Sequence, residues 1–245
     1  MRDPGQPSLP NPATLPRLFV PQALSAGQVV PATTAQAHQL GAVLRRGVGD
    51  GVRLFNGHDG EWLARIAHLR RGEAGFLPER PLRPQAAPSG PVLFFAVLKR
   101  DATDLVVQKA TELGARLIVP LQTDRSVAGR INDARLASIA TEAAEQCERL
   151  DVPEVSPLMR LDEMLARFPE SHPGARLLAA IERTQAALLV PPGDAVLIGP
   201  EGGFTPRELD LLRGRPFVHP VSLGRNVLRA ETAAIAALAR LASAE

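Results

Sequence analysis

The sequence predicts two structural regions: a small β-rich one, followed by a larger α/β one with a mostly parallel sheet. Residues 15–84 consist of short apolar runs separated by turn signals, which is typical of a small β-structure. A Pro-rich stretch at 78–91 reads as a linker. From residue 92 onward, strand-like runs alternate with helical patterns, as in parallel sheets covered on both faces.

Residues 1–14 precede the first region and contain four prolines but few large apolar side chains. Such a composition buries too little apolar surface to offset the entropy of ordering. We therefore expect this segment to be a disordered leader.

The first region begins with a predicted strand at 18–20, and a helical stretch follows at 35–45. Further strands are predicted at 51–55 and 62–67, and the intervening Phe55–Gly60 contains the Asn-Gly signal of a hairpin turn. These elements predict a small β-barrel over residues 15–84.

The second region opens with the continuous apolar run 92–97, which suits a strand buried on both faces. A helix at 103–113, stopped by Gly114, a strand at 117–121 and a long helix at 134–150 come next. The remaining predicted elements are strands at 177–181, 196–198 and 218–223 and helices at 207–212 and 230–241.

Positive charge is concentrated in the first region although the whole chain carries only +2. Residues 15–84 contain nine arginines and five acids, a balance of +4 that favours contact with a polyanion. A solvated basic face without function is the alternative, since arginine greatly outnumbers lysine throughout. The candidate phosphate contacts are Arg17, Arg45, Arg46, Arg53, Arg65, Arg70 and Arg71.

Several classes of protein are excluded by composition and motifs. No apolar run is long enough for a membrane span, and the start lacks the apolar stretch of a signal peptide. Cys147 is the only cysteine, which fits a reducing, cytoplasmic location. The five histidines are scattered, so no metal site is predicted, and neither a hydrolase elbow nor a phosphate-binding Walker lysine is present.

Two glycine-bearing loops, Gly199–Phe204 and Leu223–Thr232, each follow an apolar run and lead into a helical pattern. Glycines at strand ends allow a ligand to approach the backbone closely, so the two loops predict a crevice for a small molecule. Thr205 and Glu208 form the sequence pattern of a capping box around Pro206, which predicts a helix start. The first loop taken alone is also compatible with a simple tight turn.

Several segments, in this order and at this spacing, resemble the ribosomal RNA small subunit methyltransferase E family. The resemblance covers nearly everything from Leu15 onward. Its segments are Arg17–Val20, His38–Arg45, Gly49–Gly57, Gln108–Gly114, Glu145–Arg149, Gly199–Gly203 and Leu228–Ala233.

The resemblance implies an S-adenosylmethionine-dependent enzyme of the SPOUT class. Members have a PUA-like β-barrel that binds RNA, here residues 15–84. A SPOUT α/β domain with a trefoil knot follows, here residues 85–245, and it binds the cofactor and forms a homodimer. They methylate N3 of a uridine in the decoding region of 16S ribosomal RNA in the small subunit.

The cofactor-binding residues implied by the resemblance lie in three segments. The family reads Leu-Gly-Pro-Arg where this chain has Leu223-Gly224-Arg225-Asn226, so the arginine stands one position earlier. The implied residues are Ala179, Ile181, Ile198, Gly199, Pro200, Glu201, Gly202, Gly203, Leu223, Gly224, Val227, Leu228 and Arg229.

The chemistry of methyl transfer to uridine suggests roles for three charged residues. N3 holds a proton at neutral pH, so the reaction needs a base or a cation that stabilises the developing anion. We hypothesise that Arg229 orients the uracil and stabilises its charge, and that Glu231 or Glu201 accepts the proton. Alternatively, Glu231 only stabilises a helix start, and Arg229 only forms an ion pair or a dimer contact.

Two other functions remain open on sequence grounds. A related knotted methyltransferase would act on another RNA site, such as a ribose 2′-hydroxyl. A noncatalytic RNA-binding assembly factor would retain the fold without the chemistry, and Asn226 is compatible with it. Helix 230–243 is either a dimer face or a core-facing helix.

Overall fold

The computed structural model describes residues 11–127, 131–181 and 194–242, which divide into two compact units. The first unit comprises the residues up to 87 together with 145–151, and the second comprises 88–144 and the residues from 152 onward. The sequence assigned 145–151 to the second region, so this segment is a difference from the expected organisation.

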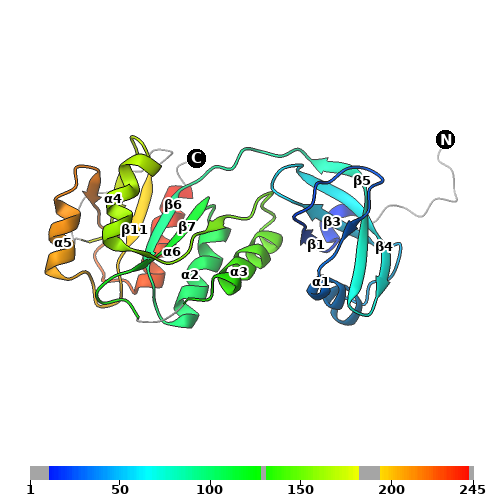
Figure 1. The fold of residues 1–245 in the computed structure, drawn as a ribbon, viewed down its shortest axis with the longest axis horizontal. Coiled ribbons are helices and arrows are strands. Elements are labelled where there is room, and N and C mark those ends of the chain that lie inside the picture. The colour runs from blue at the N-terminus through cyan, green and yellow to red at the C-terminus, as the bar shows by residue number, and fades with distance from the viewer. Residues whose placement is uncertain (1–10, 128–130, 182–193, 243–245) are drawn as a thin grey trace. The chain divides into compact units, whose positions relative to one another are not determined.

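The first unit is a five-stranded sheet with a short helical segment (Figure 1). Its elements are the 3-10 helix η1 (Pro12–Thr14), β1 (Arg17–Phe19), β2 (Val30–Pro31), α1 (Thr34–His38), the π-helix η2 (Gln39–Val43), β3 (Gly51–Phe55), β4 (Glu61–Arg70) and β5 (Glu73–Arg83).

The strands of this sheet lie in the order β1-β3-β4-β5-β2. Only β1 and β3 pair in parallel, and the other neighbours are antiparallel. The long β4–β5 ladder contains three register shifts, which let two long strands bend. Alternate residues of the strands, among them Leu18, Val52, Leu54, Ile66 and Phe76, are buried in one apolar core.

Two stretches of the first unit differ from the elements expected from the sequence. Residues 78–83 belong to strand β5 and not to a linker. Strand β2 pairs with β5 only at Gly75 and Phe76. Pro78 and Pro81 lie beyond this pairing, so the N–H groups that they lack are not needed for hydrogen bonds to β2. Residues 12–14 of the expected disordered leader form η1, because the Asn11 side chain accepts a hydrogen bond from Ala13 N. Residues 1–10 lie outside the described residues.

The second unit is a parallel sheet covered by helices. Its elements are β6 (Val92–Ala96), α2 (Arg100–Glu112), β7 (Leu117–Gln122), α3 (Asp133–Gln146), β8 (Glu154–Val155), β9 (Met159–Arg160), α4 (Leu161–Ser171), β10 (Leu177–Ala179), β11 (Ala195–Ile198), α5 (Pro206–Arg213), β12 (Val218–Pro220) and α6 (Ala230–Ala242).

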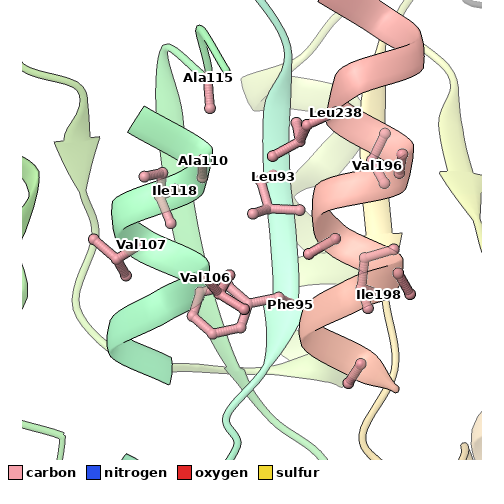
Figure 2. Packing of buried hydrophobic residues seen from close by; sticks show 14 of the residues in the cluster. Leu93, Phe95, Val106, Val107, Ala110, Ala115, Ile118, Val196, Ile198 and Leu238 are labelled. Atoms are coloured by element: carbon pink, nitrogen blue, oxygen red, sulfur yellow. The ribbon is translucent and has the colours of Figure 1, made fainter. Parts of the chain in front are cut away.

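All the strand pairs of this sheet are parallel, in the order β12-β10-β11-β6-β7-β8, and β9 also pairs with β7. Because the side chains of a strand alternate between its faces, the central strands feed two separate cores. Leu93 and Phe95 pack with helices α2 and α6 (Figure 2), and Leu136 and Ala140 of α3 belong to the same core. Val92 and Phe94 pack with α4 and α5 on the opposite face. The predicted parallel sheet covered on both faces is therefore confirmed.

Helix α4 was not predicted, and helix α3 is shorter than predicted. Leu161, Met164, Leu165 and Phe168 of α4 are buried and follow helical spacing, so the periodicity that reveals this helix was present in the sequence. The predicted helix 134–150 ends at Gln146, because Glu148 adopts a left-handed backbone with φ 63°.

A buried charge cluster joins segment 145–151 to the sheet of the first unit. The Glu61 carboxylate receives hydrogen bonds from Arg17 and from Arg83, the latter at 2.9 Å and 3.0 Å. Arg53 lies 3.7 Å from Glu61 and donates to Glu148 at 2.8 Å. The Arg17 guanidinium, 3.8 Å from the Phe55 ring centroid, also donates to the carbonyl of Arg149.

Candidate active site

The described residues contain a cavity of about 710 Å³ in the second unit, a volume typical of small-molecule sites. It lies beyond the carboxyl ends of three neighbouring parallel strands, β10, β11 and β6, where open α/β sheets bind ligands. Its walls are Lys99, Ala180, Ile181, Ile198, Gly199, Pro200, Glu201, Gly203, Phe204, Leu209, Val227, Leu228, Arg229, Ala230 and Ala233.

The first glycine loop follows β11 directly and is tightly folded. A Cβ atom at Gly199 would lie 2.8 Å from the Phe204 ring, so only glycine fits without displacing that buried side chain. Gly203 has φ +68° and donates a backbone hydrogen bond to Pro200 O at 2.8 Å. A left-handed residue at this point reverses the chain and leads it into α5.

A network of hydrogen bonds fixes the far end of this loop. Thr205 and Glu208 form the predicted capping box at the start of α5, which is confirmed together with Pro206 at the first helical position. Glu208 is buried and accepts from the backbone N–H groups of Thr205 and Asp124, each at 2.8 Å. The Arg125 side chain donates to Gly202 O at 2.8 Å. The segment after β7 therefore holds the loop after β11 in place.

The second loop runs from β12 to α6 and is anchored to β10. Val221 N donates to Ala179 O at 2.8 Å, and Arg240 of α6 donates to Leu223 O at 3.0 Å. Gly224 has φ +134°, a backbone conformation that L-residues rarely adopt. These bonds bring residues 227–230 to the same cavity as the first loop.

Three charged side chains line the cavity: Lys99, Glu201 and Arg229. All three residues are exposed, and none forms an ion pair or a side-chain hydrogen bond with another described residue. Apolar walls come from Ile181 and Ile198. The arrangement offers an apolar slot, backbone polar groups of a glycine loop and unpaired charges, which suits a nucleoside-containing cofactor.

The structure brings together most, but not all, of the predicted cofactor residues. Ala179, Gly202, Leu223 and Gly224 do not line the cavity, and the backbone oxygens of Ala179, Gly202 and Leu223 accept hydrogen bonds that fix the loops. The predicted residues that line the cavity are Ile181, Ile198, Gly199, Pro200, Glu201, Gly203, Val227, Leu228 and Arg229.

Several wall residues were not predicted from the sequence. Lys99 has the most chemical interest among them because it carries a charge. Its position directly after the apolar run 92–97, at the end of a predicted parallel strand, was the signal that could have found it. Ala180 belongs to the third segment implied by the resemblance, and Phe204 and Ala230 lie within the two predicted loops, whereas Leu209 and Ala233 were also missed.

Glu231 is absent from the cavity wall. It lies in the first turn of α6, and its Oε2 atom is buried without a hydrogen-bond partner among the described residues. A carboxylate in the first helical turn interacts favourably with the helix dipole. The geometry thus separates Glu231 from Glu201, which does line the cavity.

The expected phosphate contacts of the first unit divide into two groups. Arg17 and Arg53 are buried at 7% exposure and bind Glu61 and Glu148, which leaves their side chains little surface for contact with RNA. The sequence could not show this pairing, because Glu61 and Glu148 are distant in the chain from their partners. The remaining arginines, at least partly exposed, are Arg45, Arg46, Arg65, Arg70 and Arg71.

Two negative findings apply to the described ranges. No helix there combines the length and apolar character needed to cross a membrane. The same residues contain no group of three or more His, Cys, Asp or Glu side chains arranged to hold a metal ion.

Comparison with known proteins identifies the class of protein to which both units correspond. Residues 87–242 match a family model described as an RNA methyltransferase domain, and residues 33–74 match one described as an RNA methyltransferase PUA domain. The chain thus has a PUA domain followed by an RNA methyltransferase domain of the α/β type.

Individual relatives agree with this class. The chain is 34% identical to ribosomal RNA small subunit methyltransferase E of Rickettsia conorii, over 86% of this chain and 87% of that protein. It is 33% identical to that of a Synechocystis strain, over 85% and 71%. The structure of the Neisseria gonorrhoeae enzyme bound to S-adenosyl methionine has 30% identity and a TM-score of 0.82, covering 94% of this chain and 98% of that one. The chain belongs to the ribosomal RNA small subunit methyltransferase E family.

Proposed function

We propose that this protein transfers a methyl group from S-adenosylmethionine to N3 of a uridine in the decoding region of 16S ribosomal RNA. The main observation in support is the cavity that two glycine loops form at the ends of parallel strands. Family membership supports it, as does the S-adenosyl methionine bound to the Neisseria relative. The proposal includes action as a cytoplasmic homodimer on the small ribosomal subunit.

The residues around the cavity fit the cofactor. Ile181, Ile198 and Leu228 supply apolar contact for an adenine ring, and the Gly199–Gly203 backbone supplies polar groups without side-chain obstruction. When bound, S-adenosylmethionine supplies a methyl group on a cationic sulfur. We further propose that the two loops belong to a trefoil knot, as the family resemblance implies.

In the proposed reaction, Arg229 and Glu201 act on the uracil. Arg229 lies at the cavity wall and offers a planar fork of donors to the uracil oxygens. Glu201 lies at the same wall and would accept the N3 proton. Both carboxylate and guanidinium are free of ion pairs with the described residues, which leaves them available to the substrate.

The first unit would hold the RNA by its phosphates. Arg45, Arg46, Arg65, Arg70 and Arg71 remain as the proposed contacts. Phosphate contacts set affinity and orientation but do not read sequence. The choice of nucleotide would therefore depend on the shape of the folded ribosomal site, since aromatic residues make up only 4% of the chain and leave few stacking platforms.

The experiment that tests the proposed function identifies the methylated nucleoside. Small subunits from a strain lacking this gene are incubated with the protein and methyl-labelled S-adenosylmethionine, and the digested RNA is analysed by mass spectrometry. The expected product is N3-methyluridine at one decoding-region position.

Two other outcomes would contradict the proposal. A labelled 2′-O-methyl nucleoside would indicate a related methyltransferase with another target. Binding to the subunit without any labelled product would indicate a noncatalytic assembly factor, and calorimetry with S-adenosylmethionine would then show whether the cofactor site itself is functional.

A further inference from the structure

Lys99 stands between a buried strand and a helix, and its backbone is held on both sides. The Thr103 hydroxyl accepts from Leu98 N and donates to Leu98 O, each at 3.1 Å. Lys99 O accepts a hydrogen bond from Thr103 N at 2.9 Å at the start of α2. Both Leu98 and Thr103 are buried. The Lys99 side chain therefore extends from a fixed point on the scaffold.

The Lys99 side chain is exposed and lines the proposed methyl-transfer cavity. It forms no ion pair with a described residue, whereas Lys109, the other lysine of the chain, binds Glu112 at 2.8 Å. The charged wall residues are thus two cations, Lys99 and Arg229, and one carboxylate, Glu201. The wall carries a net positive charge.

A positive wall matches the chemistry of an anion that forms during the reaction. Loss of the N3 proton spreads negative charge over N3, O2 and O4 of the uracil. A cation close to these atoms favours the charged form and lowers the pKa of N3. An ammonium group is a compact charge suited to one oxygen, while the planar guanidinium of Arg229 suits two acceptors.

We propose that Lys99 is a catalytic residue that contacts a uracil carbonyl oxygen and stabilises the N3 anion. This role rests on the proposed function of the same cavity. N3 loses its proton to Glu201, the N3–methyl bond forms, and the carbon–sulfur bond of the donor breaks with its electron pair left on sulfur. Lys99 stays protonated throughout and exchanges no atoms.

The test compares Lys99→Met with Lys99→Arg and with the matched control Lys109→Met. Methylation of small subunits is measured from neutral to alkaline pH, and cofactor binding is measured by calorimetry. Lys99→Met should lower kcat at neutral pH about 100-fold, the usual effect of losing one preorganised charge-stabilising donor. The pH at which the rate of Lys99→Met increases should lie about one pH unit higher than for the unmodified protein, because the N3 pKa is no longer depressed.

Cofactor affinity should be unchanged in Lys99→Met, Lys99→Arg should recover part of the rate, and Lys109→Met should match the unmodified protein. An unchanged kcat and pH profile in Lys99→Met would overturn the role. So would a loss of cofactor affinity that accounts for the whole loss of rate. If the unmodified protein itself makes no N3-methyluridine, the proposed function fails, and the role of Lys99 fails with it.

Discussion

Two carboxylates, Glu201 and Glu231, differ in their position relative to the cavity, although the sequence does not distinguish them. Glu201 lies on the cavity wall, while Glu231 lies in the first turn of α6 with one buried oxygen. Sequence reasoning left both open as proton acceptors, because both fall within the glycine-loop segments. Only the folded arrangement shows which carboxylate shares the cavity with Arg229.

Glu201→Gln should lower kcat about 100-fold, since a general base contributes on this order, with little change in cofactor affinity. Glu231→Gln serves as the matched control and should lower kcat less than about tenfold. Single-turnover methylation of small subunits measures both variants. Equal losses in the two variants would contradict the assignment of Glu201.

Gly199 tests how closely the first loop is packed. Gly199→Ala places a Cβ 2.8 Å from the buried Phe204 ring, and overpacking of this kind costs about 1–3 kcal/mol. Cofactor affinity should fall about tenfold, measured by calorimetry. Gly202→Ala is the control, because its Cβ would meet only the Arg125 side chain at 3.5 Å. Similar affinities for the two variants would show that the loop adapts to the added methyl group.

At the scale of secondary-structure elements, the buried charge cluster explains how segment 145–151 is held on the sheet of the first unit. Burial raises the pKa of Glu61, but hydrogen bonds from Arg83 and Arg17 outweigh it and leave the pKa below its ordinary value. The same contacts place Arg17 and Arg83 on the carbonyls of Arg149 and Glu148, just beyond α3.

Glu61→Gln should lower the free energy of unfolding of the first unit by about 3 kcal/mol, because it leaves buried guanidinium groups without a counter-charge. Trp62, the single tryptophan, lies on β4 next to this cluster and reports the transition by its fluorescence. Glu79→Gln, which breaks the more exposed pair with Arg65, should cost less than about 1 kcal/mol.

The same cluster predicts a pH dependence of stability. Because the folded-state pKa of Glu61 is depressed, its stabilising contribution is complete above the ordinary value of about 4.5. It is lost as the pH falls from there through the depressed pKa. The stability difference between the unmodified protein and Glu61→Gln should therefore shrink below about pH 4.5. A difference that stays constant to lower pH would contradict this account.

Elements whose sequence pattern is complete within a few residues were predicted. Features that depend on contacts with residues distant in the sequence were not. Strand β3 was predicted with the bounds 51–55, and the start of α5 with its capping residues, because both patterns are complete within a few residues. Residues 78–83 of strand β5 were read as a linker, since the prolines in this part are tolerated only because it extends beyond β2. The burial of Arg17 depends on partners far along the chain.

At the scale of the whole molecule, a basic unit and a cavity-bearing unit suggest a division of labour between holding RNA and modifying it. The salt dependence of RNA binding reports the number of phosphates neutralised. The more exposed arginines of the first unit are the groups that would produce it, and Arg70 and Arg71 lie exposed at the β4–β5 turn.

Replacing Arg70 and Arg71 by Ala should weaken binding to the small subunit and reduce the slope of log K against log salt by about two, one for each phosphate contact. The control replaces Arg160 and Arg167, two exposed arginines of the second unit that pair with neighbouring acids. Filter binding at several salt concentrations measures both. Equal slopes for the two double variants would contradict a phosphate-binding role for the β4–β5 turn.

Because residues 145–151 belong to the first unit, they also limit where the chain can be cut into fragments that fold. A fragment that stops at residue 87 would lose Glu148 and the carbonyls that Arg17 and Arg83 bind. Arg53 would then lack its Glu148 partner, and Arg17 and Arg83 would keep Glu61 as a partner in a cluster opened to solvent. Expression of the first unit alone should succeed only if the heptapeptide 145–151 is spliced back or supplied as a second chain.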